Sequence, residues 1–223
     1  MSDLKNNLQS FLEKIAHKPI KLVAVSKTKP VEVLQEAYDL AWRRFGENKV
    51  QEMVAKYEKL PKDIEWHLIG TLQSNKVKFI APFVSLIHSV DRPKILAEIN
   101  RQAQNHNRII DCLLQIHIAE EESKSGFSYA EAEDFLRSVE AASYKNIRLL
   151  GLMGMATFTD NTEKIRQEFR GLKAFFDRMK EEIRIPQVDF KELSMGMSGD
   201  YEIAIEEGST IIRVGSAIFG SRA

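Results

Sequence analysis

The chain alternates between short apolar runs and longer segments with helical spacing, and this alternation constrains its fold more than any other feature. Eight runs have the composition of β-strands, at residues 21–27, 44–47, 65–70, 83–90, 111–119, 148–156, 189–196 and 210–219. Between them, apolar residues recur every three or four positions in segments 31–42, 48–57, 73–79, 93–105, 128–142, 162–183 and 199–207. Strands that alternate with helices are typical of a parallel sheet.

Local signals support these boundaries. Ser128 and Glu131 form a predicted capping box, Pro93 suits a first helical turn, and Pro186 separates the sixth intervening helix from the seventh strand. One more amphipathic helix is predicted before the first strand, from the spacing of Leu4, Leu8, Phe11, Leu12 and Ile15.

Eight strand and helix alternations favour a closed (β/α)8 barrel of the TIM type, with an extra N-terminal helix. The alternative is an open doubly wound sheet, which usually has fewer strands and a glycine-rich turn after the first one. Here that turn contains Lys27, Thr28, Lys29 and Pro30 instead. With 223 residues, 43% of them hydrophobic, we expect one domain spanning residues 1–223.

Charge and cysteine content narrow the class of function. The 32 basic and 32 acidic residues cancel, which argues against nucleic acid or an anionic membrane as a partner. Cys112 is the single cysteine and lies in an apolar run, so it is expected to be buried, and an internal disulfide is excluded. No signal peptide or uncharged stretch of about 20 residues is present, so a cytoplasmic protein is expected.

In such barrels the chemistry gathers at the C-terminal ends of the strands, and phosphate is often held after strands seven and eight. Lys27 stands at the end of the first strand, where its amine could form a Schiff base. Lysines after strands are more often solvated loop residues, but burial at a barrel mouth would lower the pKa of Lys27 and free the amine to react with an aldehyde. The other candidates at strand ends are Asn48, His67, His88, 194–198 and 213–216.

The seventh and eighth strand ends together resemble a phosphate cradle. Gly196 and Gly215 would let the backbone approach an anion, and a helix from about Gly199 would point its N-terminal amides at the charge. Hydroxyl donors are available from Ser194, Ser198 and Ser216. Turns of this composition are usually only turns, and it is their coincidence at these two strands that favours a phosphate site.

Arg213 lies within the apolar run 211–214, where an unpaired guanidinium would be costly to bury. It therefore requires a partner. That partner is either a structural carboxylate or the ring nitrogen of a bound pyridine.

Five motifs cover the chain from Val25 to Gly220 in one order: Val25-Ser26-Lys27-Thr28-Lys29-Pro30, Phe45-Gly46-Glu47-Asn48, Trp66-His67-Leu68-Ile69-Gly70, Ser194-Met195-Gly196-Met197-Ser198 and Arg213-Val214-Gly215 through Ile218-Phe219-Gly220. Together they resemble the pyridoxal phosphate homeostasis proteins, also called proline synthase co-transcribed homologues, which are related to the N-terminal domain of alanine racemase.

The resemblance implies a barrel that carries pyridoxal 5'-phosphate as an internal aldimine on Lys27. It places Asn48 beside the cofactor ring and Arg213 at the pyridine nitrogen. It assigns the phosphate to Ser194, Gly196, Ser198, Gly215 and Ser216. No metal and no catalytic residue are implied.

Two positions depart from the family pattern. Lys49 replaces an expected aromatic residue and could change the packing near the ring, while Ser216 replaces threonine and keeps the hydroxyl. His67 is more often a hydrogen-bonded core residue than a ligand. Lys29, Lys76 and Lys124 could relay cofactor, but solvated surface lysines are the better interpretation.

The arginine favours binding over catalysis, because a guanidinium protonated near pH 7 would not readily leave the pyridine nitrogen protonated, and the ring becomes a weak electron sink. Alanine racemase also uses a tyrosine from a C-terminal domain, which we do not expect in a chain ending at Ala223. The expected function is therefore pyridoxal phosphate homeostasis, as carrier, buffer or regulator, with indirect effects on amino- and keto-acid pools.

Two alternatives remain open: a racemase of low efficiency that uses the same cofactor, and a phosphosugar enzyme that lacks it. The expected partners are pyridoxal phosphate and apo forms of enzymes that use it. A monomer is expected.

Overall fold

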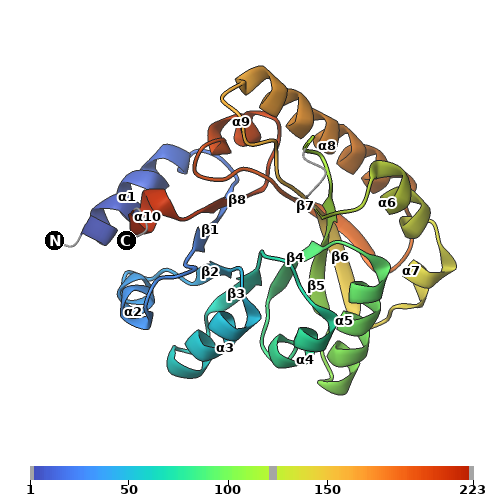
Figure 1. Cartoon of the computed structure of the whole chain (residues 1–223), viewed down its shortest axis with the longest axis horizontal. Helices are drawn as coiled ribbons and strands as arrows, with labels where there is room; N and C mark the ends of the chain where they lie inside the picture. Colours follow the sequence, from blue (N-terminus) through green and yellow to red (C-terminus); the bar gives the residue numbers. More distant parts are fainter. Residues whose placement is uncertain (1–2, 121–124, 221–223) are drawn as a thin grey trace.

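In the computed structural model, which describes residues 3–120 and 125–220, eight parallel strands close into a barrel surrounded by helices (Figure 1). Each strand pairs with the next one in the chain, and β1 pairs with β8 to close the ring, with Lys21 opposite Ile211. The strands are β1 Lys21–Val25, β2 Arg44–Glu47, β3 Glu65–Leu68, β4 Leu86–Val90, β5 Ile110–Ile116, β6 Ile147–Gly154, β7 Val188–Ser194 and β8 Ile211–Val214.

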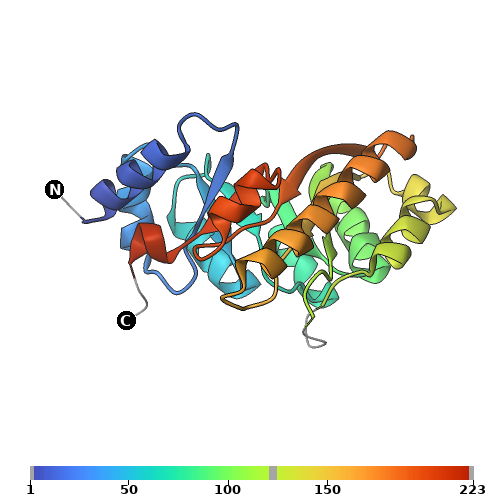
Figure 2. The ribbon, with the colours of Figure 1, turned by 90° about the horizontal axis from the view of Figure 1, so that it is seen from above.

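The helices lie outside this ring. They are α1 Asp3–Ile15, α2 Val31–Asp39, α3 Val50–Lys59, the 3-10 helix η1 Ser74–Lys76, α4 Val77–Ile80, α5 Pro93–Asn105, α6 Tyr129–Leu136, α7 Val139–Ser143, α8 Thr162–Glu182, α9 Tyr201–Glu206 and α10 Ser216–Phe219. Figure 2 shows α8, in orange, along the flank of the barrel. No helix in the described part of the chain is long and apolar enough to cross a membrane.

Apolar side chains pack on both faces of the sheet. The larger cluster lies between strands and helices and includes Phe45, Trp66 and Leu68. A smaller cluster comes from β1, β4, β5, β6 and β8 and lies in the barrel interior, at Val23, Leu86, Leu113, Leu150, Met153 and Ile211. Because both faces are covered, the strands read as continuous apolar runs rather than as alternating ones.

The (β/α)8 fold and the N-terminal helix predicted from the sequence are confirmed. The Ser128–Glu131 capping box is present, and Pro93 is the first residue of α5. The predicted helix 128–142 is two helices, because Ser138 accepts a hydrogen bond from the Ala141 N–H and starts α7 as a new N-cap.

Six of the eight predicted strands extend too far at their C-terminal ends, whereas β2 and β4 end where they were predicted to end. The first strand stops at Val25, two residues before Lys27, and the eighth stops at Val214 rather than at Phe219. After Gly215 the chain forms α10, which lies beside α1 in both views and accepts a hydrogen bond from Asn7 Nδ2 at the Ile218 carbonyl, 3.3 Å away (Figures 1 and 2). The apolar residues at these positions therefore pack on α1 and not in the sheet.

Candidate functional site

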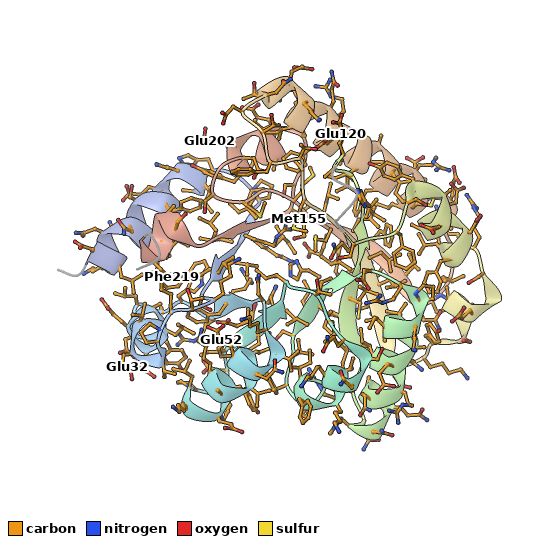
Figure 3. The ribbon with its side chains drawn as sticks, viewed as in Figure 1. Glu32, Glu52, Glu120, Met155, Glu202 and Phe219 are labelled. Atoms are coloured by element: carbon orange, nitrogen blue, oxygen red, sulfur yellow. The ribbon has the colours of Figure 1, made fainter. Side chains whose placement is uncertain are left out.

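A cavity of about 600 Å³ opens at the C-terminal ends of the strands. Six of the eight site residues predicted from the sequence line it, namely Lys27, Asn48, Ser198, Arg213, Gly215 and Ser216. Met155, another lining residue, lies inside the ring of strands, whereas Glu32 and Glu202 lie on the outer side of the molecule (Figure 3). This volume is in the range of small-molecule sites, about 300–1,000 Å³.

Lys27 is half-buried in the turn between β1 and α2. Around this turn lies a group of polar residues, which we call the Lys56 network, made of the buried Ser26, Glu47 and Lys56, the half-buried Glu52 and the exposed Thr28. The Lys56 ammonium is 2.7 Å from Glu47 Oε1 and 2.7 Å from Glu52 Oε1. It also donates to the Ser26 carbonyl at 2.8 Å.

Glu47 is fully buried in this network. Burial raises the pKa of Glu47, while the charge of Lys56 and hydrogen bonds from Lys56 and Ser26 act in the opposite direction. Ser26 Oγ donates to Glu47 Oε1 at 2.6 Å, and Glu47 Oε2 has no hydrogen-bond partner within residues 3–120 and 125–220. The Glu47 carboxylate is thus held by two side-chain donors, Ser26 in the turn before Lys27 and Lys56 on α3.

A second buried group, which we call the Arg213 network, joins Arg213, Ser194, His88 and His67. Arg213 Nη1 donates to the Ser194 carbonyl at 2.9 Å and to Ser194 Oγ at 2.6 Å. Arg213 Nη2 donates to the Gly154 carbonyl at 3.1 Å. A guanidinium has five N–H groups, so at least two N–H groups of Arg213 have no hydrogen-bond partner in the described chain. Arg213 also lines the cavity.

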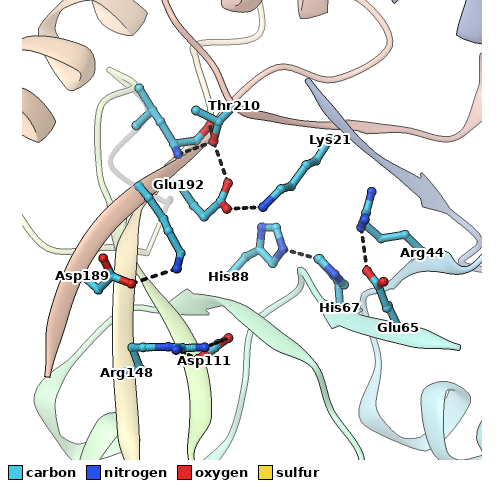
Figure 4. A network of polar contacts seen from close by, with 12 residues as sticks. Lys21, Arg44, Glu65, His67, His88, Asp111, Arg148, Asp189, Glu192 and Thr210 are labelled. Atoms are coloured by element: carbon cyan, nitrogen blue, oxygen red, sulfur yellow. Dashed lines mark hydrogen bonds and ion pairs between the residues drawn. The ribbon is translucent and has the colours of Figure 1, made fainter. Parts of the chain in front are cut away.

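The two histidines continue this network into the barrel. His88 Nδ1 is 2.9 Å from Ser194 Oγ. His88 Nε2 is 2.9 Å from His67 Nδ1, the contact marked between the two rings in Figure 4. Burial lowers the pKa of His67 to about 3 and lowers the pKa of His88 well below its usual range. Both rings are therefore neutral at pH 7, and one of the two facing nitrogens carries a hydrogen that the other accepts.

Arg213 keeps its charge at neutral pH. Burial lowers the pKa of Arg213 to about 10, and the charge of Asp200 opposes that shift. The hydrogen bonds of Arg213 in the described chain all go to neutral acceptors. The sequence left two partners open for Arg213, a structural carboxylate or the ring nitrogen of a bound pyridine. No carboxylate among the described residues forms a hydrogen bond with Arg213.

Two predicted phosphate residues do not line the cavity. Ser194 is fully buried below it, where its hydroxyl contacts His88 and Arg213. Gly196 is buried with φ +96°, and a Cβ there would come within 2.6 Å of Ala204 Cβ. Gly196 therefore allows the chain to turn sharply out of β7 toward Ser198.

Three of the predicted phosphate residues, Ser198, Gly215 and Ser216, line the cavity. A Cβ at Gly215 would lie 3.0 Å from the Val25 carbonyl, so glycine lets β8 pass close to β1. The predicted helix from Gly199 begins two residues later, at Tyr201, because Asp200 Oδ1 accepts a hydrogen bond from the Met197 N–H at 2.5 Å and holds the turn.

The candidates predicted from the sequence did not include the loop after β6, residues 155–160, which lines the cavity and carries the 98% exposed Phe158. The sequence could have indicated this loop, because it lies at the end of the predicted strand 148–156. The sequence also did not predict which residues position Asn48. A Cβ at Gly70 would lie 2.4 Å from the Asn48 carbonyl oxygen, and Ser89 Oγ donates to the Gly70 carbonyl at 2.6 Å.

The remaining lysines differ in position. Lys29 lines the cavity and donates to the Phe219 carbonyl at 3.0 Å. Lys49 is exposed at the N-terminus of α3 and is not among the lining residues. Lys76 ends η1, and Lys124 lies outside the described residues. Within those residues, no group of three His, Cys, Asp or Glu side chains could hold a metal ion.

The chain matches the family model described as "Alanine racemase, N-terminal domain" over residues 1–223. It is 42% identical to a pyridoxal phosphate homeostasis protein of Aquifex aeolicus, covering 91% of this chain and 87% of that protein. It is 38% identical to the protein of the same name from Escherichia coli K12, covering 100% and 98%. The resemblance seen in the five motifs is thereby confirmed.

Solved structures agree. PipY of Synechococcus elongatus PCC7942, determined with PLP bound, superposes with a TM-score of 0.88 at 32% identity, covering 98% of this chain and 100% of that one. An alanine racemase of Clostridium difficile 630 superposes with a TM-score of 0.72 at 15% identity, covering 99% of this chain and 57% of that one. The second likeness concerns the fold alone.

Proposed function

The chain belongs to the alanine racemase N-terminal domain family, and we propose that it binds pyridoxal phosphate through Lys27 and acts in the homeostasis of this cofactor. The observation that carries the proposal is the cavity, in which the Lys27 amine, the charged Arg213 guanidinium and the Ser198 and Ser216 hydroxyls converge. The relatives named for pyridoxal phosphate homeostasis and the structure of PipY with PLP bound support it.

The residues present fit this cofactor. When bound, pyridoxal phosphate supplies an aldehyde that condenses with a primary amine, with formation of a C=N bond and loss of water. Lys27 offers that amine at the cavity wall. Asn48 would lie beside the ring, and the unpartnered N–H groups of Arg213 would face the pyridine nitrogen.

The phosphate would be held by Ser198, Gly215 and Ser216, through two hydroxyls and a backbone that can approach an anion closely. Gly196 would shape this cradle from below. Ser194 would act one step away, by holding Arg213. The charge on Arg213 adds electrostatic attraction for an anionic ligand.

We propose that the protein stores or carries the cofactor and does not catalyse a reaction with it. Arg213 is a pure hydrogen-bond donor that stays protonated at pH 7, so it cannot hand a proton to the atom it faces and take it back. The names of the relatives are consistent with this role. Release to apo-enzymes that use pyridoxal phosphate would complete a carrier function.

The test is to incubate the purified protein with pyridoxal phosphate, record the visible spectrum, reduce with borohydride and map the labelled peptide. We expect one label, on Lys27, that is lost in Lys27→Ala. Lys29→Ala is the matched control, because Lys29 lines the same cavity two residues away. A label on Lys29, a label scattered over surface lysines, or no label would contradict the proposal.

Two further assays divide the functional alternatives. Loaded protein given single L-amino acids should form no D-enantiomer, and turnover that disappears in Lys27→Ala would make the protein a racemase. Loaded protein mixed with an apo-aminotransferase should restore its activity, and failure to restore it would exclude the carrier role while leaving a storage role.

A further inference from the structure

The turn that carries Lys27 is anchored to the neighbouring helix α3 on both sides. Ser26, the residue before Lys27, accepts a hydrogen bond at its carbonyl from Lys56 Nζ at 2.8 Å. Thr28, the residue after it, donates its N–H to Glu52 Oε1 at 2.6 Å. Lys56 and Glu52 both belong to α3 and are themselves paired one helical turn apart.

The turn needs such anchoring because Thr28 adopts φ +66°. This left-handed region is uncommon for any residue with a Cβ and is a genuine outlier for a β-branched one. Such a conformation is strained and persists only where the surroundings impose it. A relaxed Thr28 would rotate the peptide that follows Lys27 and redirect the lysine.

Lys56 is suited to impose a single geometry. It is 4% exposed, so its ammonium has to find its partners within the protein. Two of them are the carboxylates of Glu47 and Glu52, each 2.7 Å away, and they fix where the charge sits. The third hydrogen bond, to the Ser26 carbonyl, is thereby directed at the start of the turn.

We propose that Lys56 and Glu52 are positioning residues for Lys27, which hold its turn in the conformation that presents the amine to the cavity. Neither residue lines the cavity, so both act through the backbone of Ser26 and Thr28 and not through contact with a ligand. The inference rests on the proposed attachment of pyridoxal phosphate at Lys27, and it extends the functional unit to a helix outside the barrel.

The experiment measures two quantities in four variants: the rate at which borohydride-trapped label accumulates on Lys27, and amide hydrogen exchange at Thr28 without cofactor. Lys56→Met removes the charge and the bond to Ser26. Glu52→Ala removes the acceptor of the Thr28 N–H, whereas Glu52→Gln keeps an acceptor there. Lys59→Met is the control, because Lys59 is an exposed lysine at the end of the same helix.

We expect Lys56→Met and Glu52→Ala to label Lys27 about tenfold more slowly, the fold-change that matches loss of one hydrogen bond to a charged group. Thr28 exchange should rise in both. Glu52→Gln and Lys59→Met should behave like the unaltered protein. If Lys56→Met fails to fold because Glu47 is left unpaired, the Glu52 pair of variants decides, since the Glu52 side chain is 24% exposed.

Unchanged labelling and unchanged Thr28 exchange in folded Lys56→Met or Glu52→Ala would overturn the inference. Equal slowing in Glu52→Gln and Glu52→Ala would overturn the role of the Thr28 hydrogen bond. If the unaltered protein acquires no label on Lys27, the proposed function fails instead, and Thr28 exchange still tests the anchoring.

Discussion

The Lys56 network and the Arg213 network lie on two sides of one cavity and solve the burial of a cation in different ways. Lys56 is paired with two carboxylates, at 2.7 Å each. Arg213, equally buried, donates within the described chain only to neutral oxygens from Ser194 and Gly154. The Lys56 charge is compensated by direct ion pairs, whereas the Arg213 charge has neutral hydrogen-bond acceptors and only the more distant charge of Asp200.

This difference separates support from binding. A compensated charge has no remaining attraction for a ligand, so Lys56 can act only on its neighbours. Arg213 has N–H groups without a hydrogen-bond partner among the described residues, and at the cavity wall such groups can attract an anion or a ring nitrogen acceptor. We therefore propose that the charge on β8 is directed at the ligand, whereas the Lys56 charge behind β1 and β2 is structural.

The largest expected effect comes from breaking the ion pair. Glu47→Leu removes one of two carboxylates from Lys56 and should lower the free energy of unfolding by about 3 kcal/mol, because loss of one partner leaves a buried charge poorly compensated. Urea unfolding measures this. Asp63→Asn is the control, since the Arg43–Asp63 pair is exposed and its loss should cost no more than about 1 kcal/mol. Equal costs for both variants would remove the basis of the comparison.

A second prediction concerns the change of stability with pH. As pH falls, the Arg213 network should lower the free energy of unfolding and the Lys56 network should raise it. The pKa of His67 is lowered to about 3 in the folded protein, so the unfolded chain binds a proton first as pH falls. Stability should therefore drop below the unfolded pKa of about 6.5, by about 2 kcal/mol for His67 between pH 7 and pH 5. Burial raises the pKa of Glu47, so its unfavourable burial is relieved as pH falls.

Urea unfolding at pH 7 and pH 5 tests this prediction in the unaltered protein and four variants. His67→Asn should flatten the pH dependence, and Glu47→Leu should steepen it by removing the opposing contribution. His17→Asn, at an exposed histidine after α1, should leave it unchanged. A pH dependence that survives in His67→Asn and in a His88→Asn variant would show that neither buried histidine controls it.

The sequence was enough to predict the barrel, because apolar period and turn residues mark each strand and helix independently of the rest. The sequence also predicted those cavity residues whose place follows from their position at a strand end, such as Lys27 and Gly215. It could not predict that Lys56 is buried, because a lysine on an amphipathic helix has the same spacing whether it is solvated or paired. Nor could the sequence predict that Ser194 is buried below the cavity. A shift of one residue in the end of β7 decides whether this side chain faces the cavity or the barrel interior.

The smallest expected effect distinguishes the two possible roles of Ser194. Ser194→Ala removes an acceptor of Arg213 and the partner of His88 Nδ1, which should lower the free energy of unfolding by about 1 kcal/mol. Ser143→Ala, at an exposed serine of α7 bonded only to a backbone carbonyl, should change it by no more than about 0.5 kcal/mol. Inorganic phosphate, used as a competitor of pyridoxal phosphate, should compete as well with the Ser194→Ala variant as with the unaltered protein, but less well with Ser198→Ala. Weakened competition by phosphate in Ser194→Ala would mean that this hydroxyl reaches the anion, and would move Ser194 from the support of Arg213 to the cradle itself.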